Sequence, residues 1–195
     1  MSADDFSWEN AYLFRPPAEL PWNAGHADPD LVRWVETGAV PKGQALEVGP
    51  GLGHDAVFLL ERGIDVIGVD ISPTAIRLTR ENASHHGFFG YFQLGDVRRL
   101  PIEDAYVDFT YDRGCLQTLP KADQPKALSE IVRVLSLKGI FLLKIHSEKS
   151  SSPEGQSRSE IEALVRPFFH IVELKESIFE GPVTIPGYAI RLKKK

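Results

Sequence analysis

The segment 45–55 constrains this chain more than any other. An apolar run ends at Glu47 and Val48 and is followed by glycines at every second position, Gly49, Gly51 and Gly53. A glycine lets a ligand approach the backbone because it carries no Cβ. A second apolar run, 65–70, ends in the carboxylate of Asp70. This order is typical of a nucleotide-binding βαβ unit, in which the acid lies beside a ribose.

Apolar runs and helical segments alternate along the chain. We expect strands at about 44–49, 65–70, 91–95, 107–111 and 140–145, and helices at about 28–37, 54–62, 73–87 and 124–137. Asp28 or Asp30 is the N-cap of the first helix and Ser72 that of the third, with Pro73 at its first position. The order predicts one α/β domain with a doubly wound sheet and helices on both faces.

The last third of the chain contains a loop, a short helix and two more strands. Residues 147–157 are rich in Ser, Glu and Gly and indicate a mobile loop. Ser159-x-x-Glu162 then predicts a capping box that opens a short helix. The runs 169–179 and 188–192 are separated by a short loop, which favours an antiparallel pair.

Residues 1 to about 27 carry aromatic side chains and prolines with weak periodicity. The aromatic residues are Phe6, Trp8, Tyr12, Phe14 and Trp22. This segment is too apolar for a disordered tail. We expect one domain over 1–195, with residues 1–27 as an ordered arm over the site and residues 28–195 as the core.

The amino-acid composition limits the classes of partner and the kinds of site that we expect for this chain. Lys plus Arg is 22 and Asp plus Glu is 27, a net charge of -5 that disfavours a nucleic-acid partner. No apolar run approaches the roughly 20 residues that span a bilayer. Cys115 is the single cysteine, which excludes an internal disulfide or a cysteine-cluster metal site. Residues 1–5 lack the pattern of a secretion signal. We expect a cytoplasmic monomer or weak homodimer, with no metal and no membrane partner.

Two nucleotide-like ligands compete for the glycine turn. A dinucleotide would require Gly-x-Gly-x-x-Gly, but His54 stands where the third glycine would fall. Glu47 before the turn would repel a pyrophosphate, whereas it suits a ligand with an ammonium and a sulfonium. The pattern therefore favours S-adenosylmethionine over a nicotinamide cofactor.

Each strand end has an expected role toward that ligand, because ligands bind outside the carboxyl ends of the strands. Glu47 could hold the ammonium directly or through water, and Asp70 could accept both ribose hydroxyls. Asp96 could accept from the adenine amino group, while the backbone N–H of Val97 meets a ring nitrogen. The expected cofactor-binding residues are Trp22, Glu47, Gly49, Gly51, Gly53, Asp70, Ile71, Asp96, Val97 and Arg113.

Residues 44 to about 145 resemble a class I (Rossmann-like) S-adenosylmethionine-dependent methyltransferase. The matching motifs are Glu47-Val48-Gly49-Pro50-Gly51-Leu52-Gly53, Gly68-Val69-Asp70-Ile71-Ser72, Gly95-Asp96-Val97 and Phe109-Thr110-Tyr111-Asp112-Arg113-Gly114. The resemblance implies a seven-stranded, mostly parallel sheet whose last strand is antiparallel.

A narrower resemblance involves the arm. Trp8, Pro21-Trp22-Asn23-x-Gly25 and Asp112-Arg113-Gly114-Cys115 are similar to the thiopurine, thiol and halide methyltransferase group. That resemblance implies an arm that folds over the cofactor and helps to shut the site.

Methyl transfer is an in-line displacement, to which a protein contributes proximity, alignment and a dry pocket. A thiolate or halide acceptor needs no strong base, whereas a hydroxyl or amine needs a proton sink. The candidate catalytic residues are Asp112, Arg113 and His146. Arg113 could instead attract an anionic acceptor or pair with Asp112, and Asp112 could simply cap the following helix.

The sequence thus predicts a methyltransferase that acts on a small-molecule acceptor, such as a thiol, a halide or a similar nucleophile. A non-catalytic S-adenosylmethionine-binding protein of the same fold is the alternative. A nicotinamide-dependent oxidoreductase is a further alternative, which His54 disfavours.

Overall fold

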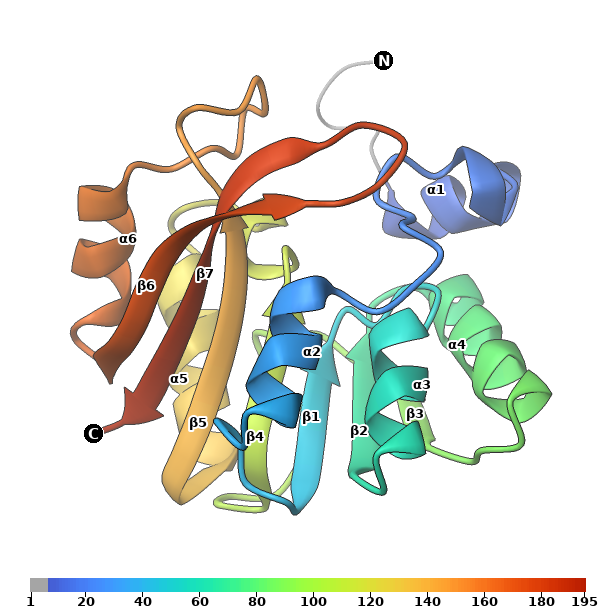
Figure 1. Cartoon of the computed structure of the whole chain (residues 1–195), viewed down its shortest axis with the longest axis horizontal. Coiled ribbons are helices and arrows are strands. Elements are labelled where there is room, and N and C mark those ends of the chain that lie inside the picture. Colours follow the sequence, from blue (N-terminus) through green and yellow to red (C-terminus); the bar gives the residue numbers. More distant parts are fainter. Residues whose placement is uncertain (1–6) are drawn as a thin grey trace.

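A seven-stranded sheet with the order β3-β2-β1-β4-β5-β7-β6 forms the middle layer of the computed structural model (Figure 1). The structure describes residues 7–195, so Phe6 and the acidic residues 1–5 of the expected arm lie outside the described residues. The strands are β1 (Gln44–Val48), β2 (Asp65–Asp70), β3 (Tyr91–Leu94), β4 (Val107–Arg113), β5 (Leu135–His146), β6 (Phe169–Phe179) and β7 (Ile185–Lys194).

The pairing follows the predicted pattern. β1 pairs in parallel with β2 and β4, β2 with β3, and β4 with β5. β7, the last strand of the chain, is antiparallel to both β5 and β6. The predicted doubly wound, mostly parallel sheet with an antiparallel last strand is therefore confirmed.

Helices cover both faces of the sheet (Figure 1). These are α2 (Pro29–Glu36), α3 (His54–Glu61), α4 (Pro73–His85), α5 (Gln124–Val134) and α6 (Arg158–Val165), whereas α1 (Trp8–Phe14) lies beyond the strand ends beside α4 (Figure 1). Apolar side chains of α2, α3 and α4 form one core with Phe109 and Leu142. Those of α5 and α6 form another with Phe141 and Leu143. Because successive residues of β5 enter opposite cores, the strand is apolar without alternation.

Two of the predicted helix starts are confirmed. Asp28 is the N-cap of α2, and its side chain accepts from the backbone N–H of Asp30. Ser72 is the N-cap of α4, with Pro73 in the first turn. These caps satisfy backbone donors that would otherwise lack a partner.

The predicted capping box of α6 is wrong by two residues. Ser157 and Glu160 form the box, and the helix begins at Arg158. The side chain of Glu162 instead forms ion pairs with Arg158 and Arg166 on the exposed face of the helix. Both pairs have the favourable i,i+4 spacing, so Glu162 stabilises the helix body rather than its start.

Two boundaries also differ from the sequence estimate. α5 ends at Val134, and β5 already begins at Leu135, where it pairs with Val107 of β4. β7 extends from Ile185 to Lys194 because it pairs with β6 beyond its apolar centre. Backbone pairing, which leaves no hydrophobic signal, extends both strands.

No helix within residues 7–195 is long and apolar enough to cross a membrane. In the same residues, no group of three or more His, Cys, Asp or Glu side chains is arranged to hold a metal ion.

Candidate active site

The strand order reverses between β1 and β4, and the candidate site lies at the carboxyl ends of the strands around this point. Glu47 lies near the end of β1, Asp70 ends β2, and His146 ends β5. Asp112 and Arg113 are the last two residues of β4. The parallel pairing of β2, β1, β4 and β5 brings the ends of these strands to one edge of the sheet.

The glycine turn is shaped by left-handed backbone. Gly49, Gly51 and Gly53 have φ angles of 68°, 58° and 78°, which disfavour residues with a side chain. A Cβ on Gly51 would lie 2.6 Å from the hydroxyl of Tyr12, and one on Gly49 would lie 3.0 Å from the Cβ of Cys115. At Gly49 and Gly51 the turn therefore presents backbone without a side chain, beneath Cys115 and Tyr12.

Asp70 ties this turn to the end of β2. Its carboxylate accepts from the backbone N–H groups of Ser72 (2.9 Å) and Gly51 (3.3 Å). Burial raises the pKa of Asp70 to about 6, although these hydrogen bonds favour the ionised form. A carboxylate has about four acceptor positions, so Asp70 can accept further hydrogen bonds. The next residue, Ile71, is 53% exposed and presents an apolar surface beside it.

Glu47 is the least compensated group of the site. Its side chain is buried, and its Oε2 atom has no hydrogen-bond partner among the described residues. Burial raises its pKa well above the usual value, and the charges of Asp55 and Asp70 add to this effect. A buried carboxylate without a partner is costly unless it receives a cation or a donor. Glu47 is thus arranged to attract a positively charged group.

Asp55 lies next to Glu47 in the first turn of α3. Its carboxylate accepts from the backbone N–H of Asp28 at 2.7 Å. Burial, followed by the charge of Asp28, raises the pKa of Asp55 to about 6. Tyr111 is paired with Glu47 across β1 and β4, and its hydroxyl has no partner among the described residues. The floor of the site is therefore acidic, and it contains buried polar atoms without hydrogen-bond partners among the described residues.

Asp96 and Val97 follow β3 as predicted, but Asp96 is already paired. Its carboxylate accepts from the backbone N–H of Arg98 (2.8 Å) and from the guanidinium of that residue, with its Nε at 3.0 Å. Arg98 also reaches Asp123 at 2.7 Å. Hydrogen bonds from Arg98 hold the pKa of Asp96 below its usual value. Val97 itself is buried. An adenine contact by these residues stays a prediction.

Asp112 has a structural task. It is fully buried, and its carboxylate accepts from the backbone N–H groups of Cys115 (2.7 Å) and Leu116 (2.9 Å). It thereby caps the short helix Leu116–Thr118. Burial raises its pKa to about 7 against the effect of these hydrogen bonds. The geometry gives Asp112 this capping role and no exposed oxygen.

Arg113 directs its guanidinium at three protein acceptors. They are the backbone oxygens of Trp22 (3.1 Å) and Glu180 (2.7 Å) and the carboxylate of Asp28 (3.1 Å). It does not pair with Asp112, whose side chain points to the opposite face of β4. Arg113 thus contacts the arm, α2 and the end of β6.

His146 is the remaining candidate acid or base. Its Nδ1 lies 2.9 Å from the hydroxyl of Ser152, which in turn hydrogen-bonds Glu154. Its ring packs edge-on against Phe179. Burial lowers the pKa of His146, so the imidazole is neutral near pH 7. A neutral imidazole can accept a proton from an acceptor molecule.

The arm covers the part of this edge around the glycine turn. Trp22 packs against Trp8 and Tyr12, with ring centroids 5.3 and 5.6 Å apart. Glu9 fastens the arm to the start of α4, because its carboxylate accepts from Thr74 N (3.0 Å), Thr74 Oγ1 (2.6 Å) and Ser72 Oγ. The arm thus lies above the glycine turn.

Comparison with known proteins agrees with this geometry. A family model described as a methyltransferase domain matches residues 46–143, about half of the chain. The chain belongs to this methyltransferase domain family.

Two curated relatives and one solved structure show how far the likeness extends. The 2-heptyl-1-hydroxyquinolin-4(1H)-one methyltransferase of Mycobacteroides abscessus is 25% identical over 75% of this chain and 66% of its own length. The probable thiol methyltransferase 2 of Arabidopsis thaliana is 35% identical over 53% of this chain and 47% of its own length. The chain therefore spans between about half and two thirds of these relatives.

The solved structure comes from work on the conversion of a disulfide bond into a thioacetal group during echinomycin biosynthesis. It superposes with a TM-score of 0.88 at 21% identity and covers 96% of this chain and 90% of that one. This likeness is one of fold, and it includes the arm as well as the family domain.

Three residues that contribute to the site, Tyr12, Glu9 and Lys144, were not predicted. Tyr12 was noted as an aromatic residue of the arm, but its place over Gly51 was not predicted. Its i,i+4 spacing from Trp8 on a helix was the available signal. Glu9 gave no signal. Lys144 interrupts the apolar run of β5, and such a residue in a buried strand indicates an ion pair.

Proposed function

We propose that the chain is an S-adenosylmethionine-dependent methyltransferase that acts on a small-molecule acceptor. The observation that carries the proposal is the unpartnered, buried carboxylate of Glu47 beside a bare glycine turn, with Asp70 at the neighbouring strand end. A ligand with an ammonium, an adjacent positive sulfur and a ribose matches these three features in order. The family assignment agrees with it.

Each residue of the site is proposed to bind a different part of the cofactor. Glu47 holds the ammonium, and Gly49 and Gly51 give the amino-acid part access to backbone. Asp70 accepts the ribose hydroxyls, for which it has unused acceptor positions. Ile71 offers its exposed side chain to the adenine face. Gly53, Asp96, Val97 and Trp22 complete the proposed cofactor site.

When bound, the cofactor supplies a methyl group on a positively charged sulfur. The chain contributes alignment and exclusion of water, because the arm covers the turn and the carboxylates face the positive ligand. His146 offers a neutral imidazole that takes a proton from an acceptor that carries one. Asp112 and Arg113 are already engaged with protein groups.

This arrangement favours an acceptor that needs no strong base, such as a thiol, a halide or a similar nucleophile. The likeness to a probable thiol methyltransferase supports the same choice. A hydroxylated heterocycle, as in the name of the Mycobacteroides abscessus relative, is the second candidate, for which His146 would act as the base.

Calorimetry with S-adenosylhomocysteine tests the site. Glu47→Gln and Asp70→Asn should each weaken binding at least tenfold, because each removes a charge or acceptor that the ligand needs. Asp65→Asn is the matched control: this exposed aspartate lies at the opposite end of β2 and should leave the affinity within twofold. Equal affinity in all four proteins would refute the proposed site.

A product assay tests turnover. We expect S-adenosylhomocysteine to form with at least one member of a panel of thiols, halides and phenols. Tight cofactor binding without product from any acceptor would favour the non-catalytic binding protein instead. Saturation-transfer NMR with NAD tests the oxidoreductase alternative, and we expect no transfer.

The proposal also treats residues 1–195 as one domain whose arm, residues 1–27, covers the site. It includes a cytoplasmic monomer or weak homodimer without a nucleic-acid partner, in line with the net charge of -5. Sedimentation of the purified chain across a concentration series tests the oligomeric state.

A further inference from the structure

Arg113 joins three segments that are far apart in the sequence. Its Nη1 donates to the backbone oxygen of Trp22 in the arm, and its Nη2 to that of Glu180 after β6. Its Nε donates to Asp28 at the start of α2. The side chain is 15% exposed, so these contacts are largely shielded from water. A planar guanidinium donates from five N–H groups on three nitrogens in a fixed fork, whereas an ammonium donates from a single nitrogen.

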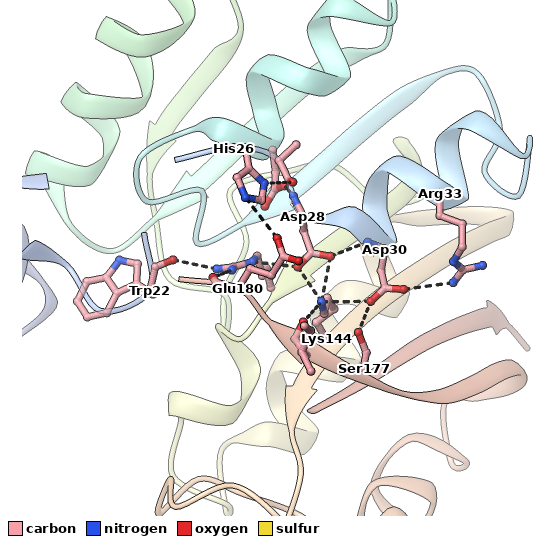
Figure 2. Close-up of polar contacts among 12 residues, drawn as sticks. Trp22, His26, Asp28, Asp30, Arg33, Lys144, Ser177 and Glu180 are labelled. Carbon is pink, nitrogen blue, oxygen red and sulfur yellow. Dashed lines mark hydrogen bonds and ion pairs between the residues drawn. The ribbon is translucent and has the colours of Figure 1, made fainter. Parts of the chain in front are cut away.

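A buried ion cluster fixes the position of Asp28. Figure 2 shows Lys144 directed at the carboxylates of Asp28 and Asp30, with Nζ to oxygen distances of 2.7 and 3.2 Å. Lys144 also donates to the backbone oxygen of Ile178 at 2.7 Å. The side chains of Lys144 and Asp28 are 1% and 0% exposed. The cluster therefore anchors α2 and the end of β6 to the interior strand β5.

The same contacts reach the cofactor half of the site through Trp22. Its backbone is held by Arg113, while its ring packs against Tyr12, whose hydroxyl lies over Gly51. On the other side, the loop after β6 approaches the arm closely. A Cβ on Gly181 would lie 2.9 Å from the backbone oxygen of Pro21.

We propose that Arg113 is a positioning residue that clamps the arm and the β6–β7 loop together over the site. It acts through the backbone of Trp22 and Glu180 and through Asp28, and it does not contact the acceptor. The proposal rests on the proposed function only for what the clamp encloses. The clamp itself is a property of the ligand-free chain.

Hydrogen exchange of the ligand-free full chain gives a readout that is independent of the cofactor. In Arg113→Gln we expect exchange at least tenfold faster in residues 8–25 and 179–185, with unchanged protection in β1 and β4. Arg158→Gln is the control, since among residues 7–195 Arg158 pairs only with Glu162 on the exposed face of α6. Arm protection that is unchanged in Arg113→Gln would overturn the proposal, as would loss of protection throughout the chain.

Kinetics separate positioning from acceptor contact. For Arg113→Gln we expect the KM for S-adenosylmethionine to rise at least tenfold while kcat falls less than threefold, because a saturating cofactor restores closure. A selective change in the acceptor KM would contradict the proposal. Arg113→Lys should keep the thermal midpoint close to that of the wild type, yet leave the arm fast-exchanging. Restored arm protection in this variant would show that charge alone, without the fork, closes the arm.

Gly181→Ala tests the same closure without altering Arg113. The added methyl pushes the loop away from Pro21, so the arm should exchange at least threefold faster, whereas Thr184→Ala in the exposed part of the loop should not change it. An unchanged arm in Gly181→Ala would contradict the joint closure of arm and loop. If the wild-type chain fails to bind S-adenosylhomocysteine, the proposed function fails, while both exchange tests still decide the clamp.

Discussion

Replacement of Asp70 by Asn should separate stability from ligand binding. In the folded chain, burial raises the pKa of Asp70 from its ordinary value of 3.8 to about 6. The folded state therefore binds the proton more tightly than the unfolded state. The contribution of this carboxyl to stability is fully present below about pH 3.8 and is lost as the pH rises to about 6. This rise in pKa corresponds to about 3 kcal/mol.

An amide does not titrate, so Asp70→Asn lacks this pH-dependent loss. The substitution also weakens the hydrogen bonds from Ser72 and Gly51, which adds a roughly constant cost of about 1 kcal/mol. The difference in unfolding free energy between variant and wild type should therefore shift by about 3 kcal/mol in favour of Asn between pH 4 and pH 8. Titrating groups that do not interact with Asp70 cancel in this difference, whereas Glu47, whose pKa the charge of Asp70 raises, adds to the shift in the same direction.

Urea denaturation followed by tryptophan fluorescence, at half-unit pH steps, measures this difference. The wild-type curve should fall relative to that of Asp70→Asn as the pH rises, and then run parallel above about pH 7. Asp65→Asn should follow the wild type throughout. Parallel curves for Asp70→Asn and the wild type over the whole range would refute the idea that burial of Asp70 costs stability.

Three further substitutions test the anchors of the site. Lys144→Met should lower the unfolding free energy by about 3–5 kcal/mol, because it removes one partner of a buried ion pair with Asp28. In urea titrations, the control Lys149→Met, which breaks an exposed ion pair, should leave the unfolding midpoint unchanged. A midpoint shift for Lys144→Met as small as that of the control would contradict the anchoring role. Glu9→Gln should weaken S-adenosylhomocysteine binding about three- to tenfold in calorimetry, since a charged acceptor for Ser72 and Thr74 is lost; an unchanged affinity would mean that arm docking does not support the ligand. Gly51→Ala should lower the unfolding free energy by about 1–2 kcal/mol because of the positive φ at this position, and it should also displace Tyr12. The thermal unfolding midpoint and the ligand affinity should therefore both fall. Wild-type values for both would contradict the tight fit at the turn.

Periodicity and turn chemistry were enough to predict the framework of the fold. The glycine turn, the acid-ended strands and the caps at Asp28 and Ser72 are local features, so neighbouring residues encode them. The ends of α5 and β7 were not predicted, because pairing with a distant strand decides them. The capping box of α6 was misplaced, since two overlapping Ser-x-x-Glu patterns occur within six residues, 157–162, and the folded chain uses the first.

The candidate site divides in the same way. The sequence places Glu47, Asp70, Asp112 and His146 at strand ends, and the structure brings these ends to one edge. The partners of Arg113 could not be predicted, because they are backbone oxygens at Trp22 and Glu180, which no side-chain motif records. Asp96 looked free in the sequence, yet Arg98, two residues later, folds back onto it. Motifs therefore identified which groups gather, whereas tertiary contacts decide which of them are engaged.

The arm that covers the site should increase the attraction between its acidic floor and a positively charged ligand. Tyr12 lies over Gly51 of the turn, and burial raises the pKa of both Glu47 and Asp70. In a shielded site a carboxylate attracts a cation more strongly than it would in water. The buried carboxyl groups of Glu47 and Asp70, whose ionisation costs the ligand-free chain stability, are thus the same groups that would hold a positively charged ligand. A clamp such as Arg113 is consistent with this balance, because the attraction depends on the arm staying closed.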